Sequence, residues 1–261
     1  MTQNPASPPL ALPPTTVLIT GAAGGVGQGI AREFARSGAN VVLHYRRSSG
    51  EAEQLQEELT QLGAQCLIVG ADIRELDQCE HIVKEAVNTF GRLDALVNNA
   101  GVQPVEPLDG MTVEQWRAVT DVNLTGTFAM TQAAASAMIA DGKGGSITHI
   151  ASVEASLPAP AHAHYASSKA GVKMHARAAA LELGHHGIRV NSVSPGLIDR
   201  GDLQQSWPEG HASWLRAVPL QRTGRPEDVG QACVFLASPH AQWISGHDLV
   251  VDGGMSAVPA W

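Results

Sequence analysis

The stretch Thr16-Val-Leu-Ile-Thr-Gly-Ala-Ala-Gly-Gly-Val-Gly27 decides the fold. Its first five residues are apolar or β-branched, which predicts a short buried strand. The glycines predict a turn, and the following residues have the apolar spacing of a helix that stops at Gly38. A strand, a glycine turn and a helix in this order are the context of a dinucleotide-binding fingerprint. There the backbone can approach a pyrophosphate, which the N–H groups and dipole of the helix N-terminus attract. A tight turn without a ligand is the alternative interpretation.

Strands and helices alternate along the rest of the chain. The pattern predicts further strands over residues 41–44, 66–70, 93–97, 146–150, 189–193 and 249–251. It predicts helices over residues 51–62, 76–90, 112–140, 163–185 and 226–236, the third of them interrupted near 123–126. The predicted fold class is therefore α/β, a single Rossmann-type domain with a doubly wound, seven-stranded parallel sheet and helices on both faces. Ligands of such a sheet bind at the carboxyl ends of its strands.

Composition and chain ends limit the classes of function. The 261 residues carry a net charge of −8, which does not favour a nucleic-acid partner. The three cysteines are scattered, as is typical of a reducing compartment, and we expect a cytoplasmic protein with no membrane span. Residues 1–14 lack the pattern of a signal peptide and are expected to form a disordered, proline-rich tail before one domain over residues 15–261. Residues 197–220 are expected to form an irregular, mobile substrate loop.

The end of the second predicted strand bears on the choice of cofactor. An NAD site usually has an acidic residue there, which binds the 2′-hydroxyl of the ribose. In this chain the strand ends His44-Tyr45-Arg46-Arg47, with two arginines and no acid. A guanidinium pairs well with a 2′-phosphate, so NADP(H) is favoured and NAD(H) is possible. Alternatively, both arginines are solvated loop residues.

The pentapeptide Tyr165-Ala-Ser-Ser-Lys169 is the candidate centre of the chemistry. On a helix, Tyr165 and Lys169 lie one turn apart on the same face. A nearby ammonium favours the phenolate, so Lys169 is expected to lower the pKa of Tyr165 from its usual value near 10. Tyr165 is then a candidate general acid or base. A half-buried tyrosine beside a solvated lysine is the alternative.

Together these motifs resemble the short-chain dehydrogenase/reductase family over about residues 16–254, with likeness to 3-oxoacyl-carrier-protein reductases and glucose 1-dehydrogenases. The motifs that carry the resemblance are the glycine turn, Asn98-Asn-Ala-Gly101, Asn123, Ser152, Tyr165-x-x-x-Lys169, Pro195-Gly196 and Val251-Asp-Gly-Gly254. The resemblance implies four catalytic residues. Ser152 matches the serine that binds the substrate oxygen, Tyr165 the acid/base and Lys169 its partner. Asn123 matches the asparagine whose backbone supports a water that links the lysine to solvent.

The resemblance also implies a set of cofactor contacts along the carboxyl ends of the strands. They are Gly21, Gly25, Val26, Gly27, Tyr45, Arg46, Asp72, Ile73, Asn99, Ala100, Gly101, Tyr165, Lys169, Pro195, Gly196 and Ile198. Two positions depart from the family pattern. Gly24 stands where many NADP-preferring members have a base, and Arg200 stands where the family often has a threonine that contacts the nicotinamide end of the cofactor. Arg200 is therefore a candidate contact for the cofactor or for an anionic substrate.

The implied function is NAD(P)(H)-dependent oxidoreduction, with reversible hydride transfer between the nicotinamide and a small-molecule carbonyl or secondary alcohol. No metal is expected, since no metal-binding motif is present. The resemblance further implies a homotetramer built from helices 112–140 and 163–185 and the last strand. A catalytically silent cofactor-binding regulator on the same fold is the alternative.

The substrate class stays open at this level. Gln103, Glu154 and His164 could form a polar pocket for a sugar or polyol, or they could simply be exposed loop residues. Alternatively, Trp207 and Trp214 could close an apolar lid over a ring ketone or an acyl-thioester.

Overall fold

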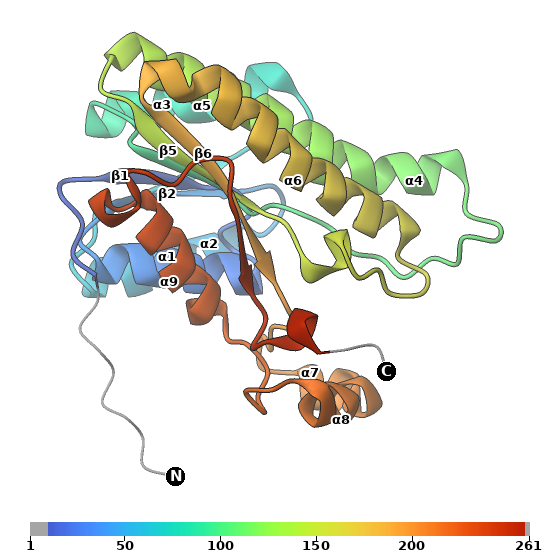
Figure 1. Ribbon diagram of the computed structural model, residues 1–261. Coiled ribbons are helices and arrows are strands. Elements are labelled where there is room, and N and C mark those ends of the chain that lie inside the picture. The colour runs from blue at the N-terminus through green and yellow to red at the C-terminus, as the bar shows by residue number, and fades with distance from the viewer. Residues whose placement is uncertain (1–9, 259–261) are drawn as a thin grey trace.

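The computed structural model describes residues 10–258 and contains one parallel sheet of seven strands (Figure 1). The strands are β1 (Thr16–Ile19), β2 (Asn40–Tyr45), β3 (Cys66–Gly70), β4 (Ala95–Asn98), β5 (Gly145–Ile150), β6 (Ile188–Pro195) and β7 (Asp248–Val251). Their order across the sheet is β3-β2-β1-β4-β5-β6-β7, and every pairing is parallel. The predicted fold class is confirmed. The chain reverses its direction of winding between β1 and β4, and ligands of doubly wound sheets bind outside such a point.

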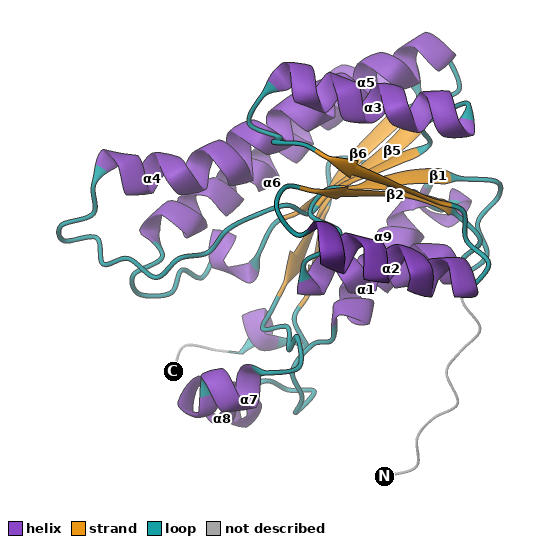
Figure 2. Ribbon diagram, turned by 180° about the vertical axis from the view of Figure 1, so that it is seen from behind, coloured by secondary structure: helices purple, strands orange, loops and turns teal. Residues whose placement is uncertain are grey.

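Helices cover both faces of the sheet (Figure 2). One layer consists of α1 (Gly25–Arg36), α2 (Ser49–Gln61) and α9 (Pro226–Ala237), and the other of α3 (Leu76–Phe90), α4 (Val113–Thr120), α5 (Gly126–Asp141) and α6 (Ala163–Leu183). Each layer buries its own apolar cluster against the sheet. The first includes Ile30 and Phe34 of α1, and the second includes Met130 and Met138 of α5.

The predicted interruption near Asn123 is a π-helical turn, η1 (Asp121–Thr125), between α4 and α5. The helix axis continues through it, so asparagine and glycine alter the winding there without ending the helix. Shorter 3₁₀ turns are η2 (Val153–Ala155), η3 (Gly184–His186), η4 (Pro239–Ala241) and η5 (Met255–Ala257).

Two expectations about the loops and ends need correction. The predicted tail over residues 1–14 begins to pack earlier than expected, because Leu10 and Leu12 lie against the first apolar cluster and the Leu12 N–H donates to the Ser37 carbonyl at 3.0 Å. Residues 1–9 of that tail lie outside the described residues. The loop over 197–220 is not irregular. It forms α7 (Leu203–Ser206) and α8 (Pro208–Ala217), and the first residue of α8 is a proline, a residue well suited to that position.

Candidate active site

Many of the predicted site residues lie at the carboxyl ends of β1, β4, β5 and β6 and in the N-terminal half of α6. The ribbon in Figure 1 shows β5, β6 and α6 side by side. The glycine turn follows β1, Asn99 follows β4, Ser152 follows β5, and Pro195 ends β6. Tyr165 and Lys169 lie in the first two turns of α6. The parallel sheet therefore places residues that are far apart in the sequence at one edge.

The glycine turn has the geometry of a phosphate cradle. Gly21 has a φ of +63°, which an L side chain rarely adopts, and a Cβ there would lie 2.9 Å from the Cα of Ala100. A Cβ at Gly27 would lie 2.8 Å from the amide nitrogen of Asn99. The first turn of α1 has no acidic residue, and no side chain caps its N-terminus. Its N–H groups and positive dipole end therefore suit an anionic group such as the pyrophosphate of a dinucleotide.

Two buried polar residues that the sequence analysis overlooked support this turn. His44 accepts a hydrogen bond from the Gly21 N–H at 3.1 Å, and the Thr20 hydroxyl accepts from the backbone N–H of Asn99 and of Ala100 at 2.9 and 3.0 Å. The Asn99 side chain donates to the carbonyls of Thr20 and Gly21. Asn99 thus holds the cradle in shape. Thr20 and His44 each stand at the end of an apolar strand, and this pattern in the sequence could have indicated their role.

Ser152, Tyr165 and Lys169 are the candidate reactive residues. The Lys169 Nζ lies 5.7 Å from the centroid of the Tyr165 ring, and the Ser152 side chain is near enough to the phenol to lower its pKa. Burial raises the pKa of Tyr165 to about 12 and lowers the pKa of Lys169 to about 8. The direction for Tyr165 is opposite to the expectation from sequence, because loss of water disfavours the phenolate more than nearby groups favour it.

Asn123 holds the neighbouring loop through its side chain. Its Oδ1 accepts from the Val102 N–H at 2.8 Å, and its Nδ2 donates to the Val102 carbonyl at 3.0 Å and to the Ser168 hydroxyl at 3.1 Å. A Cβ at Gly101 would lie 3.2 Å from the Asn123 Oδ1 and 3.5 Å from the Lys169 Nζ. The π turn therefore ties the loop after β4 to α6 beside Lys169.

Charged residues gather at the ends of β2 and β3. Asp72 accepts hydrogen bonds from Arg74, which lower its pKa to about 2, and Arg46 approaches the same carboxylate at 3.9 Å. The Tyr45 ring packs on Gly70, where a Cβ would lie 2.9 Å from the phenol carbon and oxygen. Ile73 is 4% exposed and packs under Gly126, so its side chain belongs mainly to the core.

Arg200 crosses from the segment after β6 to the glycine turn. A Cβ at Gly25, the first residue of α1, would lie 2.7 Å from the Arg200 Cδ. On the same side of the site, a Cβ at Gly196 would lie 2.9 Å from the ring of Trp214 in α8. Arg200 thus packs against the glycine turn, and Trp214 packs against Gly196, two residues before Ile198.

A polar cluster stands beside Tyr165, and its histidine is not the expected one. His164 is fully buried, and its Nδ1 accepts from the Tyr165 N–H at 2.9 Å, so it does not share a pocket with Glu154. His162 takes that place instead, with its Nδ1 at 2.9 Å from the Glu154 carboxylate. On the other side of Glu154, the Gln103 amide donates at 2.8 Å.

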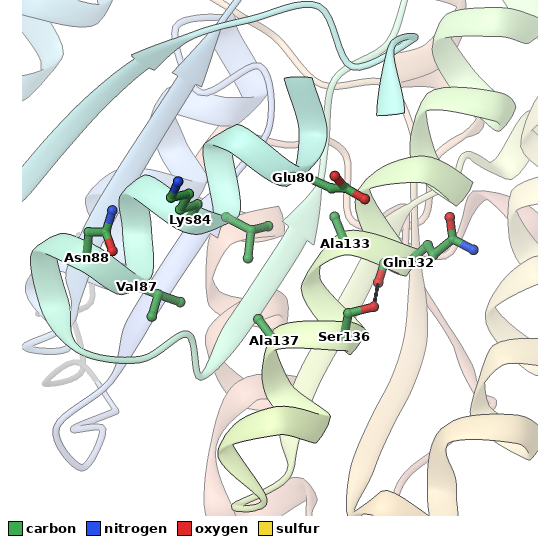
Figure 3. Close-up of a pocket in the computed structure, with 9 residues that line it drawn as sticks. Glu80, Lys84, Val87, Asn88, Gln132, Ala133, Ser136 and Ala137 are labelled. Carbon is green, nitrogen blue, oxygen red and sulfur yellow. Dashed lines mark hydrogen bonds between the residues drawn. The ribbon is translucent and has the colours of Figure 1, made fainter. Parts of the chain in front are cut away.

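A separate surface groove of about 460 Å³ lies between α3 and α5 (Figure 3). Its lining includes Glu80 and Lys84 of α3 and Gln132 and Ser136 of α5. The Ser136 hydroxyl donates to the Gln132 carbonyl of its own helix. None of the predicted site residues lines this groove, so we do not assign it to catalysis.

Within residues 10–258, no group of three or more histidine, cysteine, aspartate or glutamate side chains is arranged to hold a metal ion. In the same part of the chain, no helix combines the length and apolar character needed to cross a membrane.

Comparisons with known proteins agree with this geometry. A family model described as Enoyl-(Acyl carrier protein) reductase matches residues 21–256. The chain is 37% identical over 248 residues to the 3beta-hydroxysteroid dehydrogenase 1 of Eggerthella lenta, covering 94% of this chain and 95% of the relative. It is 39% identical over 244 residues to the L-rhamnose 1-dehydrogenase (NAD(P)(+)) of a Sphingomonas species, covering 92% and 95%. A crystal structure of a short-chain type dehydrogenase/reductase from Mycobacterium marinum superposes with a TM-score of 0.88 at 35% identity, covering 95% of this chain and 97% of that one.

Proposed function

We propose how this chain, which belongs to the short-chain dehydrogenase/reductase family and is an NAD(P)-dependent oxidoreductase acting on CH–OH groups, carries out its reaction. Ser152, Tyr165 and Lys169 are the catalytic residues, and NADP(H) is the preferred cofactor. The observation that carries the proposal is the position of these three residues. They stand at the same edge of the sheet as the glycine cradle, within one cluster.

The bound nicotinamide supplies or accepts the hydride. The chain's own residues manage the substrate oxygen and its proton. The Ser152 hydroxyl donates a hydrogen bond to the carbonyl oxygen, where negative charge develops in the transition state. Tyr165, with a pKa raised to about 12 by burial, holds its proton at neutral pH and can deliver it to that oxygen during reduction. In the oxidising direction Tyr165 must accept a proton, and the ammonium of Lys169 stabilises the phenolate.

Arg46 supports the preference for NADP(H). Within the described residues, the Arg46 guanidinium lies 3.9 Å from the Asp72 carboxylate. The Arg74 guanidinium is closer to that carboxylate, with a hydrogen bond of 2.9 Å. A weakly engaged guanidinium at the end of β2 can bind a 2′-phosphate without breaking a close ion pair. Asp72 and Tyr45 then border the adenosine.

Assembly as a homotetramer is part of the proposal. Large apolar side chains are exposed on the outer faces of α4, α5 and α6, among them Trp116, Phe128, Met174 and Leu181. Exposed apolar patches of this kind are typical of subunit interfaces. Light scattering of the purified protein tests this point, and a monomer mass would contradict it. The three free cysteines are compatible with function in the reducing cytoplasm, which we also propose.

A spectrophotometric screen at about 340 nm with NADPH and NADH tests the function. The panel contains sugars, polyols, ring ketones and acyl-thioesters, assayed in both directions. We expect turnover with at least one class and a higher kcat/KM with NADP(H). Tight cofactor binding without turnover across the whole panel would favour a silent cofactor-binding regulator instead.

A further inference from the structure

Three polar side chains from different parts of the chain converge beside the reactive phenol. Gln103 follows β4, Glu154 lies in η2, and His162 immediately precedes α6. Gln103 donates to one oxygen of the Glu154 carboxylate at 2.8 Å, and the Nδ1 of His162 lies 2.9 Å from the other. We call this set the Glu154 cluster.

The Glu154 cluster lies at the reacting centre. The Glu154 N–H donates to the Ser152 hydroxyl at 3.1 Å, so the residue is fixed to the serine that binds the substrate oxygen. The His162 ring stands edge-on to the Tyr165 ring, with centroids 6.0 Å apart. Burial is the main cause of the raised pKa of Tyr165, and the charge of Glu154 raises that pKa further. A substrate group that binds to the Glu154 cluster is therefore attached to an atom close to the reacting carbon.

The chemistry of the Glu154 cluster is that of a hydrogen-bond acceptor. An ionised carboxylate only accepts, so Nδ1 of His162 carries the hydrogen that it donates to Glu154. In neutral His162 the Nε2 is then a second acceptor, and it is buried without a hydrogen-bond partner among the described residues. The carboxylate side chain is 16% exposed and has further lone-pair directions beyond its two protein partners. Such a site needs O–H donors, which a sugar or polyol has and a simple ketone or thioester lacks.

The rings of both tryptophans pack against glycines of the chain. Trp207 lays its ring across Gly210 of α8, where any Cβ would clash with it. Trp214 packs its ring on Gly196, and its indole nitrogen is buried without a partner in the described chain. Trp207 thus packs within its own helical segment, whereas the charged cluster faces the reactive residues.

We propose that the Glu154 cluster binds a hydroxyl on the carbon next to the reacting carbon, and that the substrate is a polyhydroxylated carbohydrate, an aldose or a polyol. This inference rests on the proposed function of Ser152 and Tyr165. Glu154 is the binding group, Gln103 steadies it at the exposed side, and His162 is a positioning residue.

Paired substrates test the proposal directly. Aldoses and polyols, such as D-glucose and sorbitol, are compared with analogues that lack the neighbouring hydroxyl, such as 2-deoxy-D-glucose, and with cyclohexanol. We expect the wild-type kcat/KM for the best hydroxylated substrate to exceed that for its deoxy analogue by about 100-fold, as a buried polar site left unpaired would give. Glu154→Gln should reduce this ratio of kcat/KM values at least about tenfold. A Glu57→Gln substitution, at an exposed position of α2, should leave the ratio unchanged.

The positioning role of His162 has its own readout. Asparagine can place an amide donor near the position of the histidine Nδ1, whereas leucine cannot donate. We expect His162→Leu to raise the KM for the hydroxylated substrate more than it lowers kcat, and His162→Asn to restore part of the loss. Circular dichroism and cofactor titration check that each variant is folded.

Different failures have different meanings. If cyclohexanol or ring ketones are turned over and no aldose or polyol is, the carbohydrate inference is overturned while the proposed oxidoreductase function stands. An unchanged ratio of kcat/KM values in Glu154→Gln has the same meaning. If no alcohol or carbonyl is turned over although the cofactor binds, both the function and the inference fail.

Discussion

Lys169 donates a 2.6 Å hydrogen bond from its Nζ to the main-chain carbonyl of Ile150, the last residue of β5. Lys169 is buried in α6, and Ile150 lies two residues before Ser152. This bond joins the helix that holds the phenol to the strand that holds the serine. Because a buried ammonium needs a partner, it also fixes the spacing between Ser152 and Tyr165.

The phenol held by this arrangement is predicted to be essential. Tyr165→Phe removes the transferable proton and leaves the ring, so we expect kcat to fall by about 10²–10⁴-fold or more. The affinity for the cofactor, measured by fluorescence titration, should change little, because the glycine cradle is intact. Appreciable turnover by the variant would refute the assignment.

Two charged neighbours should move the pH profile in opposite directions. Burial is the main cause of the raised pKa of Tyr165; Glu154 adds to the rise, and Arg200 opposes it. Oxidation of an alcohol requires Tyr165 to accept a proton, so its activity falls as pH drops below the pKa of the phenol in the complex. Glu154→Gln lowers that pKa and shifts the acidic limb of kcat/KM to lower pH. Arg200→Thr raises it and shifts the limb to higher pH. Shifts of the same sign in both variants would contradict this electrostatic account.

Cofactor preference should depend on Arg46. Arg46→Ala removes the guanidinium that is proposed to pair with the 2′-phosphate, so the Kd for NADP⁺ should rise roughly 10- to 100-fold. The Kd for NAD⁺ should change much less, because no phosphate is present at that carbon. Isothermal titration with both cofactors measures the difference, and equal losses for the two would count against the assignment.

Stability should fall on mild acidification. Burial lowers the pKa of His149 to about 3, with smaller contributions from His175 and Lys169, and burial also lowers the pKa of His44. Below about pH 6.5 the unfolded chain binds protons that these folded-state histidines do not, so the free energy of unfolding decreases as pH falls. For His149, the loss approaches about 1.4 kcal/mol per pH unit between the two pKa values.

Urea unfolding between about pH 7 and pH 5 measures that slope. His149→Gln should reduce the slope by the equivalent of about one proton taken up on unfolding. His81→Gln, at an exposed position of α3, should leave the slope unchanged. A free energy of unfolding that stays constant over this interval would contradict the prediction.

The contact between α1 and α9 should tolerate no side chain at Gly29. A Cβ there would clash with Pro226, so Gly29→Ala should destabilise the fold by roughly 1–3 kcal/mol. Gly50 of α2 has no atom within 4 Å of its Cβ position. Gly50→Ala is therefore the matched control and should stabilise the fold by about 0.5–1 kcal/mol. Thermal unfolding of both variants compares them, and equal effects would show that packing at Gly29 is looser than described.

The fold could be predicted because it depends on local patterns. Apolar runs such as Thr16–Thr20, alternating with amphipathic helices, imply a doubly wound sheet whatever the details of packing. The pairing of Tyr165 with Lys169 was also local, since four residues on a helix fix which side chains share a face. The two short helices within residues 197–220 were not predicted, because the apolar residues of this segment are irregularly spaced.

Other features depended on neighbours distant in sequence. His162, not His164, faces Glu154, because the loop before α6 turns one histidine into the core and the other toward η2. Gln103 joins them from 51 residues away. No local pattern distinguishes these histidines.

The sequence by itself determined the parallel sheet, the glycine turn after β1 and the shared helix face of Tyr165 and Lys169, because spacing along strands and helices sets which residues share an edge or a face. Only the tertiary structure decided how those residues are charged and what surrounds them. The pKa of Tyr165 rises where the pentapeptide alone suggested a fall, since desolvation comes from segments that the helix meets only in the folded chain.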